Sequence, residues 1–312
     1  RTNTVRKDVI GETTVSFFGQ AEIEWARKLR MTVGVRSDLY RYDVTALRPL
    51  NTGAGTTGIV SPKVTAVIGP WGGSELYLNY GTGFHSNDVR GATTTVDPIN
   101  ETVVTREDPL VPARGAEVGF RTIAVPGLQS TLAAWYLGFD SELIFVGDAG
   151  IAEASHPSRR YGLEWTNYLK LKPWLTVELD MSFSHAEFTG NNSEGNYIPG
   201  ALNRVVAGAI TVTPAKPVFG SVRIRHFGPR PLTKDGRFYS QPTTVFNGEL
   251  GWTIHDQLNI TLEGFNLLNS AVSDIDYYYT SRLLGEPAGG VDDIHLHPSL
   301  PRTLRLQFNV LF

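Results

Sequence analysis

The densest group of metal-ligand side chains is the stretch Asp292-Asp-Ile-His-Leu-His297, which directly precedes Pro298. On an extended strand His295 and His297 are two residues apart and share one face, an arrangement that can chelate a metal ion. The alternative is that these side chains line a polar rim and contact water or a neighbouring segment. We expect the rim role, and the sequence assigns no metal and no other cofactor.

Arginines form a second group, on the polar side of segments in which polar and apolar residues alternate: Arg36, Arg121, Arg223, Arg225 and Arg305. Such guanidinium groups can attract an anionic ligand, for example a metal chelate or a citrate-like carboxylate. Several glutamates also lie on the polar side of such segments and could neutralise these arginines: Glu22, Glu24, Glu117, Glu178 and Glu263. We expect these charges to pair with one another or with a neighbouring domain, with ligand contact by Arg223, Arg225 and Arg305 as the alternative.

Two further segments place polar or aromatic side chains beside loops. His85, Asp88 and Arg90 follow an alternating stretch and could contact a ligand, although a structural role at a rim is the simpler interpretation. Tyr277-Tyr-Tyr279, with Tyr278 at its centre, suits contact with a catechol or sugar ring. An interfacial position for these tyrosines is an equal alternative.

We expect no enzymatic activity. Gly81-Thr-Gly-Phe84 is not followed by Lys-Ser/Thr or by a helical pattern, so it is not a phosphate-binding loop. The sequence has no Gly-x-Ser-x-Gly elbow. Ser184 and His185 are adjacent and therefore point to opposite faces of a strand.

The elements that must position these residues are strands, because apolar residues recur with a period of two. One example alternates Leu175, Val177, Leu179, Met181 and Phe183 with polar residues. The last ten residues do the same, with Leu304, Leu306, Phe308, Val310 and Phe312 on one face. A strand that ends the chain on an aromatic residue is typical of the closing strand of a transmembrane β-barrel. We expect Phe308, Val310 and Phe312 to serve barrel closure and recognition by the barrel assembly machinery.

Composition excludes several other classes. The chain has 312 residues, a net charge of −3 and no cysteine, so a nucleic-acid binder and a disulfide scaffold are not expected. The longest apolar stretch, Gly200–Val212, contains Arg204 and is too short for a spanning helix. The polar first residues, Arg1–Lys7, contain no signal peptide, so we expect the sequence to belong to a longer precursor.

Short and long connections alternate along the chain. The short ones are Arg27–Arg30, Pro70–Gly73, Pro126–Gln129, Lys172–Trp174, Pro214–Pro217 and His255–Gln257. The long ones are Leu47–Thr57, His85–Arg114, Gly147–Arg159, Thr189–Ala201, Gly228–Tyr239 and Asn269–Leu300. Outer-membrane barrels have short periplasmic turns and long outer loops. Trp25, Trp71, Trp174 and Trp252 lie in or beside short turns, which predicts an aromatic girdle at the periplasmic rim.

We count about thirteen strands, beginning near Glu12, Met31, Ile59, Ser74, Gly115, Ser130, Arg160, Leu175, Leu202, Val218, Gln241, Leu258 and Pro301. Single-chain bacterial barrels have an even number of antiparallel strands. With an odd number the first and last strands run in the same direction and cannot close antiparallel. We therefore expect residues 1–312 to be one all-β domain, the C-terminal portion of a larger barrel.

Several stretches resemble TonB-dependent outer-membrane receptors. Met31-Thr-Val-Gly-Val-Arg-Ser-Asp-Leu-Tyr40 resembles the family's L-x-x-G-x-R-x-D strand. Ser61-Pro-Lys-Val64 with Leu76–His85 is similar to its SPK … Y-G-x-G-F hairpin, and Ala116–Arg121 to its E-x-G-x-R strand. Leu262-Glu-Gly-Phe-Asn-Leu-Leu-Asn269 resembles its near-terminal signature. There Asn266 and Asn269 can cap the turn that leaves the strand.

The resemblance implies a barrel of about 22 strands around an N-terminal plug, of which this chain supplies about the last thirteen. It implies active uptake of a scarce nutrient, commonly an iron–siderophore complex, across the outer membrane of a Gram-negative bacterium. The implied partners are the ligand, the lipid bilayer and the TonB complex, the last through an N-terminal region that this sequence lacks. A passive porin or structural barrel is the alternative, and a soluble β-sandwich is a third possibility.

Overall fold

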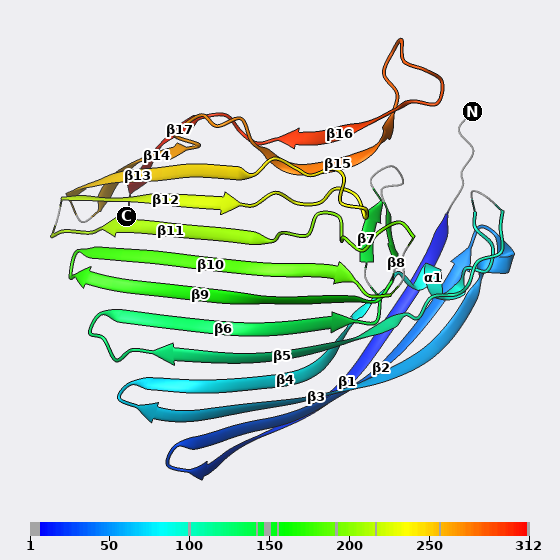
Figure 1. The fold of residues 1–312 in the computed structure, drawn as a ribbon, viewed down its shortest axis with the longest axis horizontal. Coiled ribbons are helices and arrows are strands. Elements are labelled where there is room, and N and C mark those ends of the chain that lie inside the picture. Colours follow the sequence, from blue (N-terminus) through cyan, green and yellow to red (C-terminus); the bar gives the residue numbers. More distant parts are fainter. Residues whose placement is uncertain are drawn as a thin grey trace.

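The computed structural model describes residues 7–98, 101–141, 143–146, 151–154, 156–190, 193–215, 217–255 and 257–310. Figure 1 shows a chain made almost entirely of long strands. The main strands are β1 (Asp8–Ala26), β2 (Leu29–Ala46), β3 (Gly53–Trp71), β4 (Ser74–Ser86), β5 (Leu110–Thr122), β6 (Leu128–Phe139), β9 (Ser158–Lys172), β10 (Leu175–Phe188), β11 (Arg204–Val212), β12 (Val218–Phe227), β13 (Thr243–His255), β14 (Leu258–Phe265) and β17 (Thr303–Val310). The minor elements are η1 (Pro49–Asn51), α1 (Val89–Thr93), β7 (Leu143–Val146), β8 (Ile151–Ala154), β15 (Ser273–Ser281) and β16 (Val291–Pro298).

The thirteen main strands form one antiparallel sheet, which confirms the strand count predicted from the sequence. Neighbours in the sheet follow chain order from β1 to β17, interrupted only where β7–β8 and β15–β16 form separate two-stranded sheets. Figure 1 shows the sheet as a curved wall with β1 and β17 at its two edges. No helix in the described ranges is long and apolar enough to cross a membrane.

The connections have the predicted arrangement, with tight turns at one end of the sheet and long loops at the other (Figure 1). The predicted loop Leu47–Thr57 is shorter than expected, because Gly53–Thr57 continues β3 and pairs with β2 from Val44 to Tyr40. The predicted loop Asn269–Leu300 contains a hairpin of its own, β15–β16, and a second hairpin, β7–β8, begins before the predicted loop Gly147–Arg159 and ends inside it. Short strands in a loop give too few alternating residues to be recognised in the sequence.

The sheet has one apolar face and one polar face. Phe17 is 73% exposed on the apolar face, and Leu306 is 58% exposed there at the other edge of the sheet. Exposed apolar side chains over a whole face are what a barrel presents to lipid, whereas its interior is polar. We therefore call the two faces the lipid face and the lumenal face. Trp25, Trp71, Trp174 and Trp252 are all exposed near the short-turn edge, as expected for the girdle.

The last strand contributes to the lipid face as predicted. Phe308 pairs with Ile260 of β14 and Val310 pairs with Leu258. Both Phe308 and Val310 are exposed. Phe312 lies outside the described residues.

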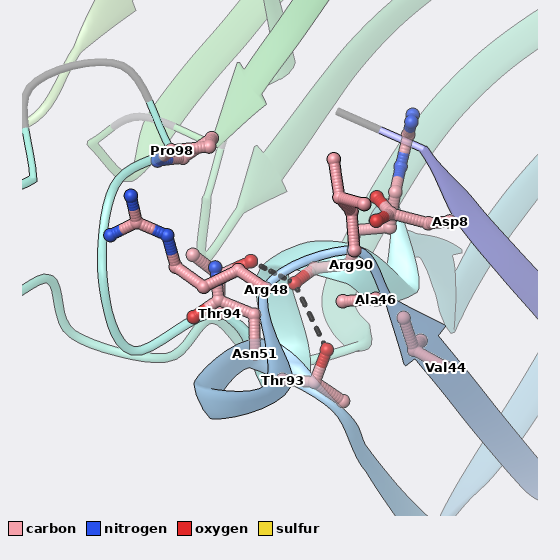
Figure 2. A pocket seen from close by; sticks show the side chains of 10 residues that line it. Asp8, Val44, Ala46, Arg48, Asn51, Arg90, Thr93, Thr94 and Pro98 are labelled. Carbon is pink, nitrogen blue, oxygen red and sulfur yellow. Dashed lines mark hydrogen bonds between the residues drawn. The ribbon is translucent and has the colours of Figure 1, made fainter. Parts of the chain in front are cut away.

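The loop between β4 and β5 folds onto the lumenal face of β2. Tyr40 and Val44 of β2 form a small buried cluster with Val89 of α1 and Leu110. The buried side chain of Asn51, in the connection between β2 and β3, fastens that connection to the β4–β5 loop. Its Nδ2 donates to the carbonyl of Val96 at 2.8 Å, and its Oδ1 accepts from the backbone amide of Thr95 at 3.0 Å. Figure 2 shows the cavity enclosed here, which at about 10 Å³ has room for no more than one water molecule.

Aromatic rings lie flat against the lumenal wall wherever the facing residue is glycine. Tyr42 covers Gly55, Tyr77 covers Gly119, and Phe219 covers Gly251, each directly across a strand pair. A Cβ added to any of these glycines would collide with the ring. Glycine is therefore required at these positions for close approach and not for a turn.

Asn266 and Asn269 both adopt positive φ, at 48° and 52°, in the turn that follows β14. The Asn266 side chain donates to the carbonyls of Ser270 (3.0 Å) and Leu300 (3.2 Å) and accepts from the Ser270 amide at 2.9 Å. The Asn269 side chain accepts from the Arg302 amide at 3.0 Å. The two amides thus join the end of β14 to the start of β17, which confirms the predicted capping role.

Replacing Asn266 tests this junction. In the full-length protein Asn266→Ala should lower the free energy of unfolding by about 3 kcal/mol, because three hydrogen bonds are lost at about 1 kcal/mol each. Asn266→Gly should cost about 1 kcal/mol less than the alanine variant, since glycine tolerates positive φ. Thermal unfolding in detergent measures both, and equal stability of Asn266→Ala and the wild type would contradict the assignment.

Candidate ligand-binding site

Three of the five predicted lumenal arginines are neutralised by carboxylates. Arg36 donates to Asp38 through Nε and Nη2, the latter at 2.7 Å from Oδ1. Arg121 pairs with Glu75 at 2.5 Å, and Arg305 lies 3.3 Å from Glu263 directly across the β14–β17 pair. All three are therefore paired, as expected, but only Arg305 pairs with one of the proposed glutamates, Glu263; the partners Asp38 and Glu75 were not among the acidic residues proposed from the sequence.

Arg223 and Arg225 of β12 differ from the other three. Both are exposed, and neither forms an ion pair or side-chain hydrogen bond with any other residue in the described parts of the chain. The one recorded contact is that of the Arg225 guanidinium with the ring of Phe227, 5.3 Å from its centroid. The register explains the missing partners, because Arg223 faces Ala209 and Arg225 faces Ala207 on the adjacent strand β11.

The two arginines form one wall of an open lumenal cleft of about 370 Å³. Its floor is Ala207 and Ala209, and its opposite wall consists of Glu178 and Asp180 of β10. Adjacent strands lie about 4.8 Å apart, so the arginine-bearing and carboxylate-bearing strands are about 10 Å apart. The alanines separate the opposite charges instead of bridging them.

The cleft can therefore bind a ligand that carries negative charge on one side and donors or cationic groups on the other. Two guanidinium groups on alternate positions of one strand present planar donors to carboxylate or catecholate oxygens. Asn247 of β13 completes the basic side of the cleft. Its Oδ1 accepts the Asn266 amide at 2.9 Å, which fixes the side chain and leaves its amino group available.

The residues predicted near the mouth are largely engaged in local structure. Asp88 caps α1 by accepting the Arg90 amide at 3.0 Å, and its carboxylate also pairs with the Arg90 guanidinium. The hydrogen bond to Asp88 raises the pKa of Arg90. His85 lies on the lumenal face with its ring 5.8 Å from that of Phe139, and its Nε2 is buried with no hydrogen-bond partner.

The other predicted contacts belong to the β15–β16 hairpin. The Tyr278 ring stacks on Phe238 at 3.9 Å, and the His295 ring stacks on Tyr279 at 3.8 Å. His297 is 73% exposed, with Nδ1 3.9 Å from an Asp274 oxygen. Within the described residues no three metal-ligand side chains converge, so the geometry does not assemble a metal site here.

A buried ion pair holds this hairpin to the loop between β12 and β13. Arg230 donates to Asp276 at 2.8 Å, with only 15% and 4% of the two side chains exposed. Asp276 also accepts the Ser273 hydroxyl at 2.5 Å. A second link joins that loop to its neighbour, where a hydrogen bond from Lys234 holds the pKa of Glu194 below its ordinary value.

The sequence placed Asp180 on the polar side of its strand but did not propose Asp180, Asn247, Arg230 or Asp276 as site residues. Asn247 also lies on the polar side of its strand, so the same signal could have identified it as lumenal. Arg230 and Asp276 are separated by 46 positions and lie in loops, where no periodicity indicates which residues meet.

Both the sequence and the fold can be compared with those of known proteins. The family model described as TonB dependent receptor-like, beta-barrel, matches residues 2–267. No curated protein sequence matches the chain.

Solved structures resemble it at low sequence identity. The ferric yersiniabactin uptake receptor FyuA from Yersinia pestis is 14% identical, with a TM-score of 0.77 over 97% of this chain and 46% of that one. The ferric-catecholate import receptor Fiu from Escherichia coli K12 is 14% identical, with a TM-score of 0.75 over 98% and 45%. The copper transporter OprC is 13% identical, with a TM-score of 0.73 over 97% and 48%. The chain thus spans about half the length of the structures that it matches.

The buried pair leads to a prediction about the hairpin. Asp276→Asn should leave Arg230 buried without a counter-charge, which costs about 3–5 kcal/mol when a buried pair is broken. We therefore expect faster amide hydrogen exchange across β15 and β16 in the full-length protein. Asp274→Asn, an exposed change two positions away, is the control and should leave exchange unchanged. Equal exchange in the two variants would show that the pair does not hold the hairpin.

Proposed function

Because this chain belongs to the TonB-dependent receptor β-barrel family, we propose that it binds and imports an anionic metal chelate, with a ferric siderophore as the leading candidate. The family consists of transporters, not enzymes, in the outer membrane of Gram-negative bacteria, and this chain is an outer-membrane barrel component. Import driven by the TonB complex and assembly by the barrel assembly machinery are part of the proposal.

The observation that carries this proposal is the pair of free arginines in the lumenal cleft. A lumenal charge that only serves the barrel wall is expected to be paired, as Arg36, Arg121 and Arg305 are. Arg223 and Arg225 instead face an alanine floor and leave room for about 370 Å³ of ligand. That volume lies within the range of about 300–1,000 Å³ that is usual for small-molecule sites.

The similar structures support a metal chelate as the ligand class. Their titles describe import of ferric catecholate, uptake of ferric yersiniabactin and transport of copper. Siderophore complexes carry carboxylate or catecholate oxygens, which match guanidinium donors. Aromatic side chains on the β15–β16 hairpin, Tyr278 and His295, together with His85 and His297, are further proposed contacts along the path from the mouth.

Uptake by cells tests the proposal directly. A strain that lacks the full-length gene should lose transport of at least one complex in a panel of radiolabelled ferric siderophores. When the double variant Arg223→Gln/Arg225→Gln complements this strain, the apparent Kd for the transported complex should rise at least about tenfold. The reason is that hydrogen bonds to charged groups contribute about 1.5–3 kcal/mol each. Arg305→Gln, which changes an arginine already paired with Glu263, is the matched control and should bind normally.

Three outcomes would redirect the proposal. Normal affinity in the double variant would remove the cleft from the binding site. Uptake that persists after the proton-motive force is collapsed would favour a passive porin. If the deletion strain still takes up every iron complex in the panel, the search turns to other metals, sugars or cobalamin.

A further inference from the structure

The lipid face carries a groove that the uptake function does not use. It lies over β3, β4, β5 and β6 and has a volume of about 480 Å³. Ala66, Ala116 and Ala134 form its floor, and Leu78, Tyr80 and Tyr136 rise beside them. Because this face meets the bilayer, a ligand for the groove must come from the membrane.

Strand register places large side chains on both sides of Ala116. Ala116 pairs with Tyr80 on β4 and with Tyr136 on β6, so a methyl group lies between two aromatic side chains. The two tyrosine-bearing strands lie about 10 Å apart, which leaves a slot for a single acyl chain. Further along, Val118 pairs with Ala134, so the floor continues toward the middle of the lipid face.

The end of the slot nearest the long loops is polar. Arg114 lies on the same face as Ala116, two residues closer to the long-loop end, and directly faces Gly138 of β6. A Cβ built on Gly138 would lie 3.2 Å from the Tyr136 hydroxyl and 3.4 Å from Nε of Arg114. The Tyr136 hydroxyl and Nε of Arg114 therefore both lie over Gly138, which has no side chain.

The guanidinium of Arg114 has no ion-pair partner among the residues that the structure describes. Arg159, which is also on the lipid face and lies on β9, two strands away from Arg114, is paired with Glu187 at 2.5 Å. A guanidinium and a hydroxyl that lie over the same glycine are suited to phosphate oxygens, which accept several hydrogen bonds at once.

We propose that this groove binds a phosphate-bearing acyl lipid of the outer leaflet, which in a Gram-negative outer membrane is lipopolysaccharide. Its phosphate lies on Arg114 and Tyr136, and one of its acyl chains lies in the slot over Ala116. The long-loop end of the sheet faces outside in such barrels, so the polar end of the groove is at the depth of the outer headgroups. The site is on the opposite face from the lumenal cleft, so its failure would leave the uptake proposal intact.

Binding of a defined probe to the full-length protein in detergent tests the site. Native mass spectrometry with intact, phosphorylated lipid A should show one lipid molecule retained on the wild-type protein. Arg114→Gln should weaken retention about tenfold, by loss of a charge-assisted contact. Ala116→Leu and Ala116→Phe should weaken it by filling the slot. Arg41→Gln, which changes an exposed lipid-face arginine that faces Thr13 and Thr56, is the matched control and should retain lipid normally.

The remaining probes separate the sources of phosphate. Dephosphorylated lipid A should bind the wild type about as weakly as intact lipid A binds Arg114→Gln. Equal retention of phosphatidylglycerol would show a general annular contact, and displacement of lipid by millimolar inorganic phosphate would show a soluble-anion site. Either result would overturn the proposal, as would unchanged retention in Arg114→Gln or an equal loss in Arg41→Gln. Correct folding of each variant is checked by its heat-dependent mobility in gels.

Discussion

Backbone hydrogen bonding between neighbouring strands is the constraint on which the rest of this structure depends. Within lipid no water is available to pair with an exposed amide or carbonyl, so each strand must be satisfied by its neighbours. The ladder meets this requirement for the strands from β2 to β14, whereas β1 and β17 are each paired on one side only within the described residues. A ladder fixes the side-chain period at two, and that period divides the residues between lipid and lumen. The lumenal cleft and the lipid-face groove are both consequences of which residues this register places opposite one another.

Much of the fold could be predicted from the sequence because the membrane imposes this period over long segments. Strands such as β10 and β17 show uninterrupted alternation, so their number and order were correctly identified. Prediction failed where the strand leaves the membrane. Gly53–Thr57 contains only glycine, alanine and threonine and suggests a loop, yet these residues still pair with β2. The β15–β16 hairpin is held by contacts between distant residues, among them the Arg230–Asp276 ion pair and the Tyr278–Phe238 stack, for which the sequence has no periodic signal.

The candidate site shows a similar division. Phase alone identified Arg223, Arg225 and Arg305 as lumenal, but it could not show which of them are free. That depends on the residue directly across the next strand: Arg305 faces Glu263, whereas Arg223 and Arg225 face alanines. Glu178, expected to neutralise an arginine, instead lies across the alanine floor from two of them. A small residue between opposite charges thus distinguishes an open cleft from a neutral wall.

The aromatic rings that cover glycines on the lumenal wall have a further consequence for the shape of the passage. Tyr42, Tyr77 and Phe219 are among the largest lumenal side chains, yet each ring lies along the wall over the glycine on the neighbouring strand. The rings therefore add apolar packing to the wall without narrowing the interior. A methyl group at one of these glycines would collide with the ring and displace it from the wall. The space left free on the lumenal side of the sheet thus depends in part on residues that have no side chains.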